Sequence, residues 1–106
     1  MKVFLIRERS GVKATGEFDP TTKALTVLKG SILSETVAHT EKFRGAKSIE
    51  KSREGVLKGN VLQIDVPFKS ASTSANFVTG SSTNGLTAWK DRSGKTIKDI
   101  IAEIEG

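Results

Sequence analysis

The fold class is decided by residues 2–28, which read KVFLIRERSGVKATGEFDPTTKALTVL. Residues 2–7 and 12–18 have the composition of two β-strands, and Ser10-Gly11 breaks the chain between them. Asp19-Pro20-Thr21-Thr22 is typical of a turn, because proline fixes φ at the second turn position. Strands this close together leave no room for crossover helices, so the pattern predicts antiparallel pairing.

A third strand is expected over residues 24–28, and residues 61–68 have the clearest strand pattern of the chain. There apolar residues alternate with other side chains, which predicts one buried face. The apolar set is Leu62, Ile64, Val66 and Phe68. Pro67 cannot donate a ladder hydrogen bond, so this strand is expected to end there or to lie at a sheet edge. Residues 32–44 have no clean period and are expected to be irregular, with one short strand as an option.

Two helices are expected in the middle of the chain. The first covers residues 46–54 and ends near Gly55. The second covers residues 71–78, with Ser70 as its N-cap and Gly80 as its stop.

The final segment predicts a third helix, capped by Thr96. Its apolar residues recur at helical spacing and are expected to pack on the core. They are Ile97, Ile100, Ile101 and Ile104. Before it, Asn84-Gly85 favours a tight turn with positive φ, followed by a short strand through Leu86 and Trp89. The sum is an α+β fold: a small, mostly antiparallel sheet of about five strands with about three short helices packed on it.

Composition predicts one soluble domain over residues 1–106. Hydrophobic residues make up 36% of the 106 residues and charged residues 27%, which is a globular balance. The chain has no cysteine, so disulfides and thiolate metal sites are excluded. The opening apolar run is too short for a membrane span, and the expected location is the cytoplasm. The formal charge of +5 favours nucleic acid, acidic proteins or anionic surfaces as partners.

The chain is not expected to be an enzyme, and no cofactor is expected. His39 is the only histidine, so neither a metal set nor a nucleophile–base pair can be completed with it. Ser93-Gly94-Lys95-Thr96 resembles the end of a P-loop, but Trp89 stands where that motif needs its first glycine. The carboxylates are scattered along the chain. A small enzyme whose groups converge only on folding remains a third, weaker hypothesis.

A series of short motifs runs from residue 14 to the end of the chain. They are Ala14-Thr15-Gly16, Lys29-Gly30-Ser31, Glu54-Gly55-Val56-Leu57, Phe68 with the serine-alanine helix after it, Asn84-Gly85, Trp89-Lys90-Asp91 and Gly94-Lys95-Thr96. With these motifs the chain resembles a prokaryotic domain-of-unknown-function family often found at the C-terminal end of GIY-YIG nucleases and other DNA-modification proteins. It is also similar to the restriction-enzyme adenine methylase associated (RAMA) domain. The family often has tryptophan after Asn-Gly, where this chain has Leu86. The resemblance implies a nuclease or methyltransferase as a protein partner and DNA as a ligand.

Basic residues gather at three places and are the candidate nucleic-acid contacts. The first group would share one helix face at spacings of three and four. The second adjoins the serine-rich helix start, and the third surrounds the turn before the last helix. In chain order they are Arg44, Lys47 and Lys51, then Lys69, then Lys90, Arg92 and Lys95. The alternative for the first group is an ordinary solvated helix face. The hydroxyls beside Lys69 could hold a phosphate, with helix capping and tight packing as the alternative; they belong to Ser70, Ser72, Thr73 and Ser74. Trp89, beside the third group, is expected in the core rather than stacked on a base.

Two functions follow from these features. The first is a non-enzymatic accessory domain that binds nucleic acid, DNA above all, and is associated with DNA modification or restriction. The second is a protein–protein interaction module without nucleic-acid binding, which an exposed apolar patch would favour.

Overall fold

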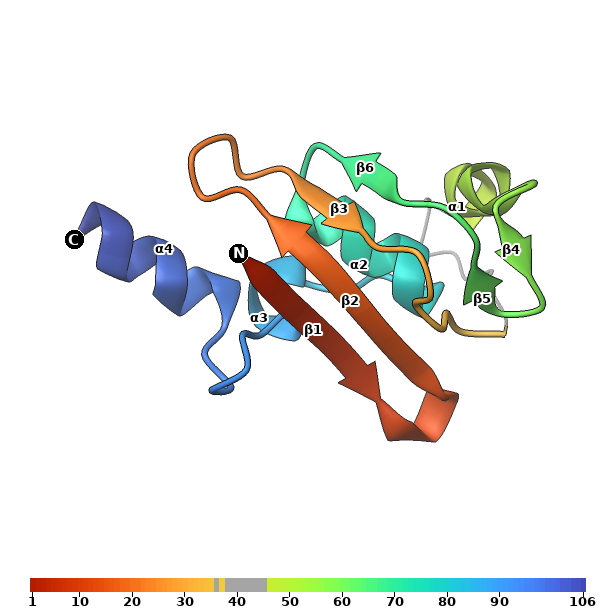
Figure 1. Cartoon of the computed structure of the whole chain (residues 1–106), viewed down its shortest axis with the longest axis horizontal. Coiled ribbons are helices and arrows are strands. Elements are labelled where there is room, and N and C mark those ends of the chain that lie inside the picture. The colour runs from red at the N-terminus through yellow and green to blue at the C-terminus, as the bar shows by residue number, and fades with distance from the viewer. Residues whose placement is uncertain (36, 38–45) are drawn as a thin grey trace.

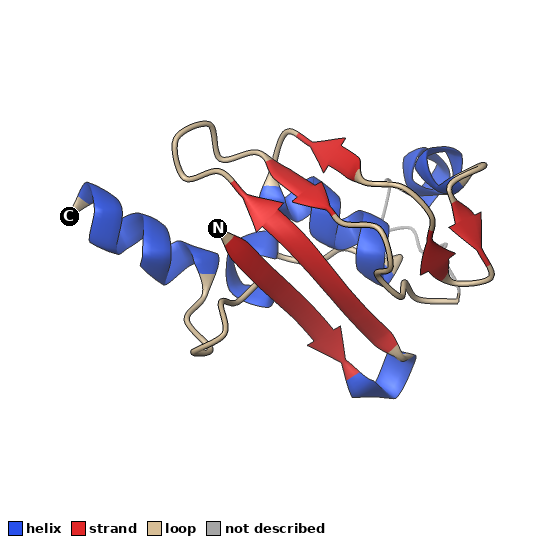
Figure 2. Ribbon diagram, in the orientation of Figure 1, coloured by secondary structure: helices blue, strands red, loops and turns tan. Residues whose placement is uncertain are grey.

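The computed structural model describes residues 1–35, 37 and 46–106 and confirms an α+β fold (Figures 1 and 2). The strands are β1 (Lys2–Arg7), β2 (Val12–Phe18), β3 (Leu25–Val27), β4 (Leu57–Lys58), β5 (Val61–Leu62) and β6 (Val66–Phe68). The helices are α1 (Ala46–Arg53), α2 (Ala71–Thr79), α3 (Gly85–Ala88) and α4 (Ile97–Glu105), with a 3₁₀ turn over Glu8–Ser10. None of the helices in these described ranges is long and apolar enough to cross a membrane.

The sheet is forked, and β2 is the strand from which both branches leave. In one branch the order is β1-β2-β3-β6, with every pair antiparallel. In the other, Ile32 bridges β2 to β5, which pairs with β4. Ile32 exchanges both backbone hydrogen bonds with Lys13, at 2.9 Å each. The fork therefore joins the two-stranded β4-β5 hairpin to the main sheet.

One face of this sheet is covered by helices and forms the core. In Figure 1, α2 and α3 lie behind the strands, and no helix of the described chain crosses in front of β1 and β2. The inner face carries Val3 and Leu5 of β1 and alternate residues of β2 and β3, all buried. Trp89 is fully buried against them, which confirms its expected place in the core.

Several local predictions are confirmed. Ser70 caps α2, accepting a 3.2 Å hydrogen bond from the Thr73 amide. Thr96 caps α4 in the same way through the Asp99 amide. In the turn after β2, Asp19 Oδ1 accepts from the Thr21 amide at 2.8 Å. Pro67 lies in β6, an edge strand of the main branch, as expected from its missing amide proton.

The continuous strand predicted over residues 61–68 is wrong. The chain leaves one branch of the fork after β5 and joins the other at β6, so the alternation restarts between them. Leu62 is buried, but Ile64, in the connection, is 53% exposed. Asp65 holds this bend by accepting a 2.7 Å hydrogen bond from the Lys29 amide.

The turn and strand predicted over residues 84–89 are also wrong, because α3 occupies this segment. Asn84 is the N-cap of α3 and Gly85 is not among the glycines of positive φ. Gly85 is needed for packing instead: a Cβ there would lie 2.2 Å from the backbone carbonyl carbon of Ala71. The absence of a side chain lets α3 begin directly against α2.

Helix α4 packs on the core only through its first half. Ile97 and Ile100 are buried and Ile101 is partly buried, whereas Ile104 is 59% exposed. Figure 1 shows α4 extending away from the sheet. The prediction that the whole isoleucine stripe packs on the core is therefore wrong at its last member.

Candidate nucleic-acid interface

The helix-free side of the sheet presents rows of directly paired residues, which we call the open face. Its central row is Lys90–Phe4–Thr15. Phe4 and Lys90 exchange both backbone hydrogen bonds, at 2.7 and 2.9 Å, so their side chains lie on the same side of the sheet. Trp89, the residue before Lys90, points to the opposite side of the sheet, because successive side chains of an extended chain alternate.

A second row crosses both branches of the fork. It runs Ile6–Lys13–Ile32–Val61–Lys58, each member directly opposite the next. All five residues are exposed, with Ile6 at 57%, Ile32 at 38% and Val61 at 39%. The row therefore combines three aliphatic side chains with two lysines, across strands that are about 4.8 Å apart.

The third row is Lys2–Glu17–Thr26–Pro67. Within these three rows, all in the described part of the chain, Glu17 is the one carboxylate. It receives a 2.7 Å ion pair from the terminal ammonium group. The cations Lys2, Lys13, Lys58 and Lys90 are thus opposed by a single acid.

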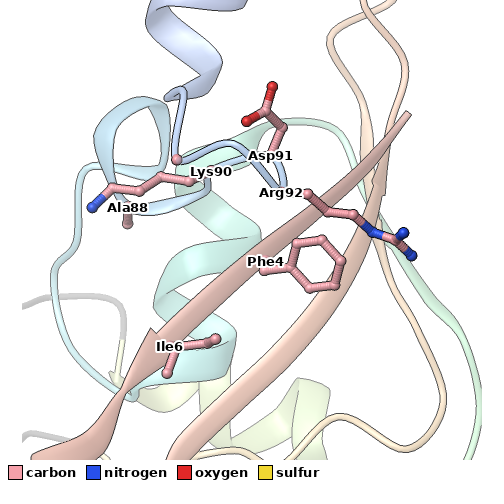
Figure 3. A pocket seen from close by; sticks show the side chains of 7 residues that line it. Phe4, Ile6, Ala88, Lys90, Asp91 and Arg92 are labelled. Atoms are coloured by element: carbon pink, nitrogen blue, oxygen red, sulfur yellow. The ribbon is translucent and has the colours of Figure 1, made fainter.

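A pocket of about 310 Å³ lies at the rim of the open face, beside β1 (Figure 3). Phe4 and Ile6 line it from the sheet, Ala88 from the end of α3, and Lys90 and Arg92 from the chain that follows. Figure 3 shows the Arg92 side chain extending past the Phe4 ring. An exposed guanidinium, an ammonium group and an aromatic ring therefore border one hollow.

Asp91 also borders this pocket, but its carboxylate is engaged in the following loop. Its Oδ1 accepts hydrogen bonds from the Ser93 hydroxyl at 2.7 Å and from the amides of Ser93 and Lys95 at 2.9 and 3.0 Å. The Ser93 hydroxyl, with these amides, holds the pKa of Asp91 below its ordinary value. These hydrogen bonds occupy two amides that a phosphate would need. Residues 93–96 therefore form a turn before a capped helix and not a P-loop.

The structure separates the basic residues singled out from the sequence. Lys90 and Arg92 meet at the pocket. Lys95 instead pairs with Glu103 at 2.6 Å, which raises its pKa above the ordinary value. Exposed Lys47 and Lys51 lie on α1, at the opposite end of the molecule in Figure 1. The remaining two are Lys69, exposed in the β6–α2 connection, and Arg44, which lies outside the described residues, as does His39.

Arg53, at the end of α1, has a structural role. Its guanidinium donates to Phe77 O at 2.7 and 3.0 Å, to Ser34 O at 2.9 Å and to Val78 O at 3.3 Å. These acceptors include carbonyls of the last turn of α2, where a cation is favoured by the helix dipole. The group is thereby committed to joining α1 to α2.

The serine cluster at the start of α2 is occupied by internal contacts. Ser70 caps the helix, Ser72 Oγ accepts from the Gly85 amide at 3.2 Å, and Ser74 Oγ accepts from Trp89 Nε1 at 3.0 Å. Capping and close packing therefore account for the three hydroxyls. In the described ranges, no three His, Cys, Asp or Glu side chains are arranged to hold a metal ion.

The open face contains residues that sequence reasoning missed, namely Phe4, Ile6, Lys13, Ile32, Lys58 and Val61. One signal was available. Strand β1 has apolar residues on both of its faces. Val3 and Leu5 point into the core, so Phe4 and Ile6 point away from it. An antiparallel sheet with one open face normally places polar residues there.

This geometry defines a class of small α+β domain. Its antiparallel sheet is forked, and one side of that sheet is the open face. The profile of the family described as "Domain of unknown function (DUF4357)" matches residues 4–101. The chain therefore belongs to this family. No curated protein and no solved structure matches it.

Proposed function

We propose that this chain is a non-enzymatic accessory domain that binds nucleic acid through the open face and its rim. The observation that carries the proposal is the arrangement of five cations around that face and its rim, against two carboxylates, Glu17 in the third row and Asp91 at the pocket. The cations are Lys2, Lys13, Lys58, Lys90 and Arg92.

Phosphate binding is the function that such a surface supports best. Each cation that neutralises a phosphate releases condensed counterions, so a spread of exposed cations gives affinity that falls with salt. Apart from Glu17, which pairs with the terminal ammonium group, and Asp91, which is engaged in its own loop, the neighbouring side chains are aliphatic, aromatic or hydroxyl groups that do not repel a polyanion. Among the residues that the structure describes, no helix covers the open face, so an extended ligand has access to it (Figure 1).

The biological setting is proposed from resemblance. The chain resembles domains attached to GIY-YIG nucleases and DNA-modification proteins, which favours DNA as the ligand and a nuclease or methyltransferase as a partner. A cytoplasmic role in DNA modification or restriction is the setting we propose.

Fluorescence anisotropy tests the proposal, using labelled single-stranded DNA, duplex DNA and adenine-methylated duplex at low and physiological salt. We expect saturable binding whose logarithmic affinity falls linearly with the logarithm of salt concentration. A difference between methylated and plain duplex would support the link to modification. Absence of binding to every probe at low salt would overturn the proposal.

A second candidate function, a protein-interaction module, is favoured by α4. Its outer half carries Ile104, 59% exposed, and continues the stripe that Ile97 begins. If this helix holds a partner, Ile104→Asp should abolish a partner's co-purification from the native host while DNA binding is unchanged. Recovery of the same partner by both proteins would reject the helix as the docking element.

A further inference from the structure

Phe4 is an aromatic residue that the packing of the core does not require. Its side chain is partly exposed on the open face and belongs to neither buried cluster of the described chain. Its paired neighbours are Lys90 and Thr15, neither of which covers a ring. The aromatic ring therefore contributes little to the core and leaves apolar surface for a ligand.

The apolar surface continues from Phe4 across the fork. Ile6 lies two residues along β1 and lines the same pocket, and Ile32 and Val61 follow it in the second row. Lys13 separates Ile6 from Ile32, and Lys58 ends the row. A lysine thus lies within one or two strand spacings, of about 5 Å each, of every apolar side chain in the row.

We propose that the ligand of the open face is single-stranded nucleic acid, with a base stacked on Phe4 in the pocket beside Lys90 and Arg92. This inference rests on the proposed function and names the form of its ligand. In a duplex the faces of the bases are buried by stacking on one another, so a duplex would present mainly phosphates to this surface. The apolar side chains of the open face would then have no ligand groups to contact. An unpaired strand presents bases to the aromatic and aliphatic positions and phosphates to the cations between them.

The pocket suits this role in size and lining. At about 310 Å³ it is at the lower end of the range of about 300–1,000 Å³ found for ligand pockets. Phe4, Ile6 and Ala88 supply an apolar floor, and Arg92 and Lys90 supply positive charge at the edge. The Asp91 carboxylate at this edge accepts hydrogen bonds from Ser93 and Lys95. Stacking on a ring and contact with an alkyl chain do not read sequence, so binding should tolerate every base.

The test compares Phe4→Ala with the wild-type chain on labelled oligothymidylate, oligouridylate and a duplex of matched charge. The two single strands distinguish DNA from RNA. Ile104→Ala is the matched control, because it removes an exposed apolar side chain from α4, away from the open face. Phe4→Leu is measured in parallel because it keeps the apolar volume if alanine impairs folding, which near-ultraviolet circular dichroism of buried Trp89 reports.

We expect the single strands to bind more tightly than the duplex, and Phe4→Ala to weaken single-strand binding roughly tenfold or more, as removal of a stacking residue does. Phe4→Leu should weaken it less, and Ile104→Ala should not change it. A 2-aminopurine base in the strand should be quenched by the wild type and not by Phe4→Ala. Duplex binding that is tighter and indifferent to Phe4 would overturn this inference and leave the proposed function standing. No binding of any probe at low salt would overturn both.

Discussion

The Trp89 indole donates a 3.0 Å hydrogen bond from Nε1 to Ser74 Oγ, and both side chains are fully buried. Ser74 in turn donates to Ala71 O at 2.6 Å. Tryptophan can occupy a core when its one polar atom finds such a partner. The contact joins α2 to the segment that leads onto the open face, and it uses a serine that the sequence offered as a phosphate ligand.

Ser74→Ala should lower the free energy of unfolding by about 1–3 kcal/mol, because it leaves the buried indole N–H without an acceptor. Urea denaturation followed by Trp89 fluorescence measures this. Ser82→Ala is the control, since Ser82 is exposed in the loop after α2. Equal stability of the two variants would show that the indole bond is dispensable.

Gly85→Ala should destabilise the fold by about 3 kcal/mol or more, because overpacking at a rigid backbone contact forces α3 off α2. The added Cβ would meet the Ala71 carbonyl carbon and oxygen at 2.2 Å and the Ser72 nitrogen at 2.5 Å. Thermal unfolding gives the comparison, with exposed Thr87→Ala on the same helix as the control. An unchanged melting temperature for Gly85→Ala would contradict the packing described for α3.

Arg53→Ala should cost about 2–3 kcal/mol of stability, because it removes hydrogen bonds from a charged group to carbonyls at the end of α2. Lys51→Ala, two residues earlier and exposed, should change stability by no more than about 0.5 kcal/mol. Chemical denaturation of the two alanine variants separates the structural arginine from a surface lysine. Similar losses in both would remove the distinction.

Stability should fall in acid partly through Asp91. The Ser93 hydroxyl and nearby amides hold the pKa of Asp91 below its ordinary value, so the folded state favours its ionised form. That contribution is present above the unfolded pKa of about 3.9 and is lost as the pH falls through the lower folded pKa. Asp91→Asn should therefore show a smaller drop in urea midpoint between neutral pH and pH values below about 4. The same drop as in the wild type would show that the loop does not depend on this charge.

Local structure could be predicted where its cause is local. Ser70 and Thr96 cap their helices because a hydroxyl next to free amides needs no distant partner. The break between β5 and β6 at Ile64 could not be predicted, because it depends on how the two branches of the sheet are arranged. Gly85 shows the same limit, since its role depends on Ala71 in another helix.

The candidate site was less predictable than the fold. The charge pattern alone indicates Lys90 and Arg92 as candidates. Their position beside Phe4 depends on the backbone bridge between Phe4 and Lys90, which are distant in the chain. The row from Ile6 to Lys58 depends on Ile32, which bridges strands from within a segment without strand periodicity. Pairing between distant segments, rather than composition, brings these side chains together.

Two charge-reversal variants test the central claim, that nucleic acid binds at the open face, most directly. Lys90→Glu/Arg92→Glu changes the rim, Lys47→Glu/Lys51→Glu changes α1, and each lowers the formal charge from +5 to +1. The measurement is the slope of log affinity against log salt for a labelled single strand. We predict that the rim variant reduces the magnitude of this slope by about 1.4, as expected for two lost phosphate contacts. The α1 variant should keep the slope of the wild type. Equal effects of both variants, or a larger effect from α1, would contradict the assignment.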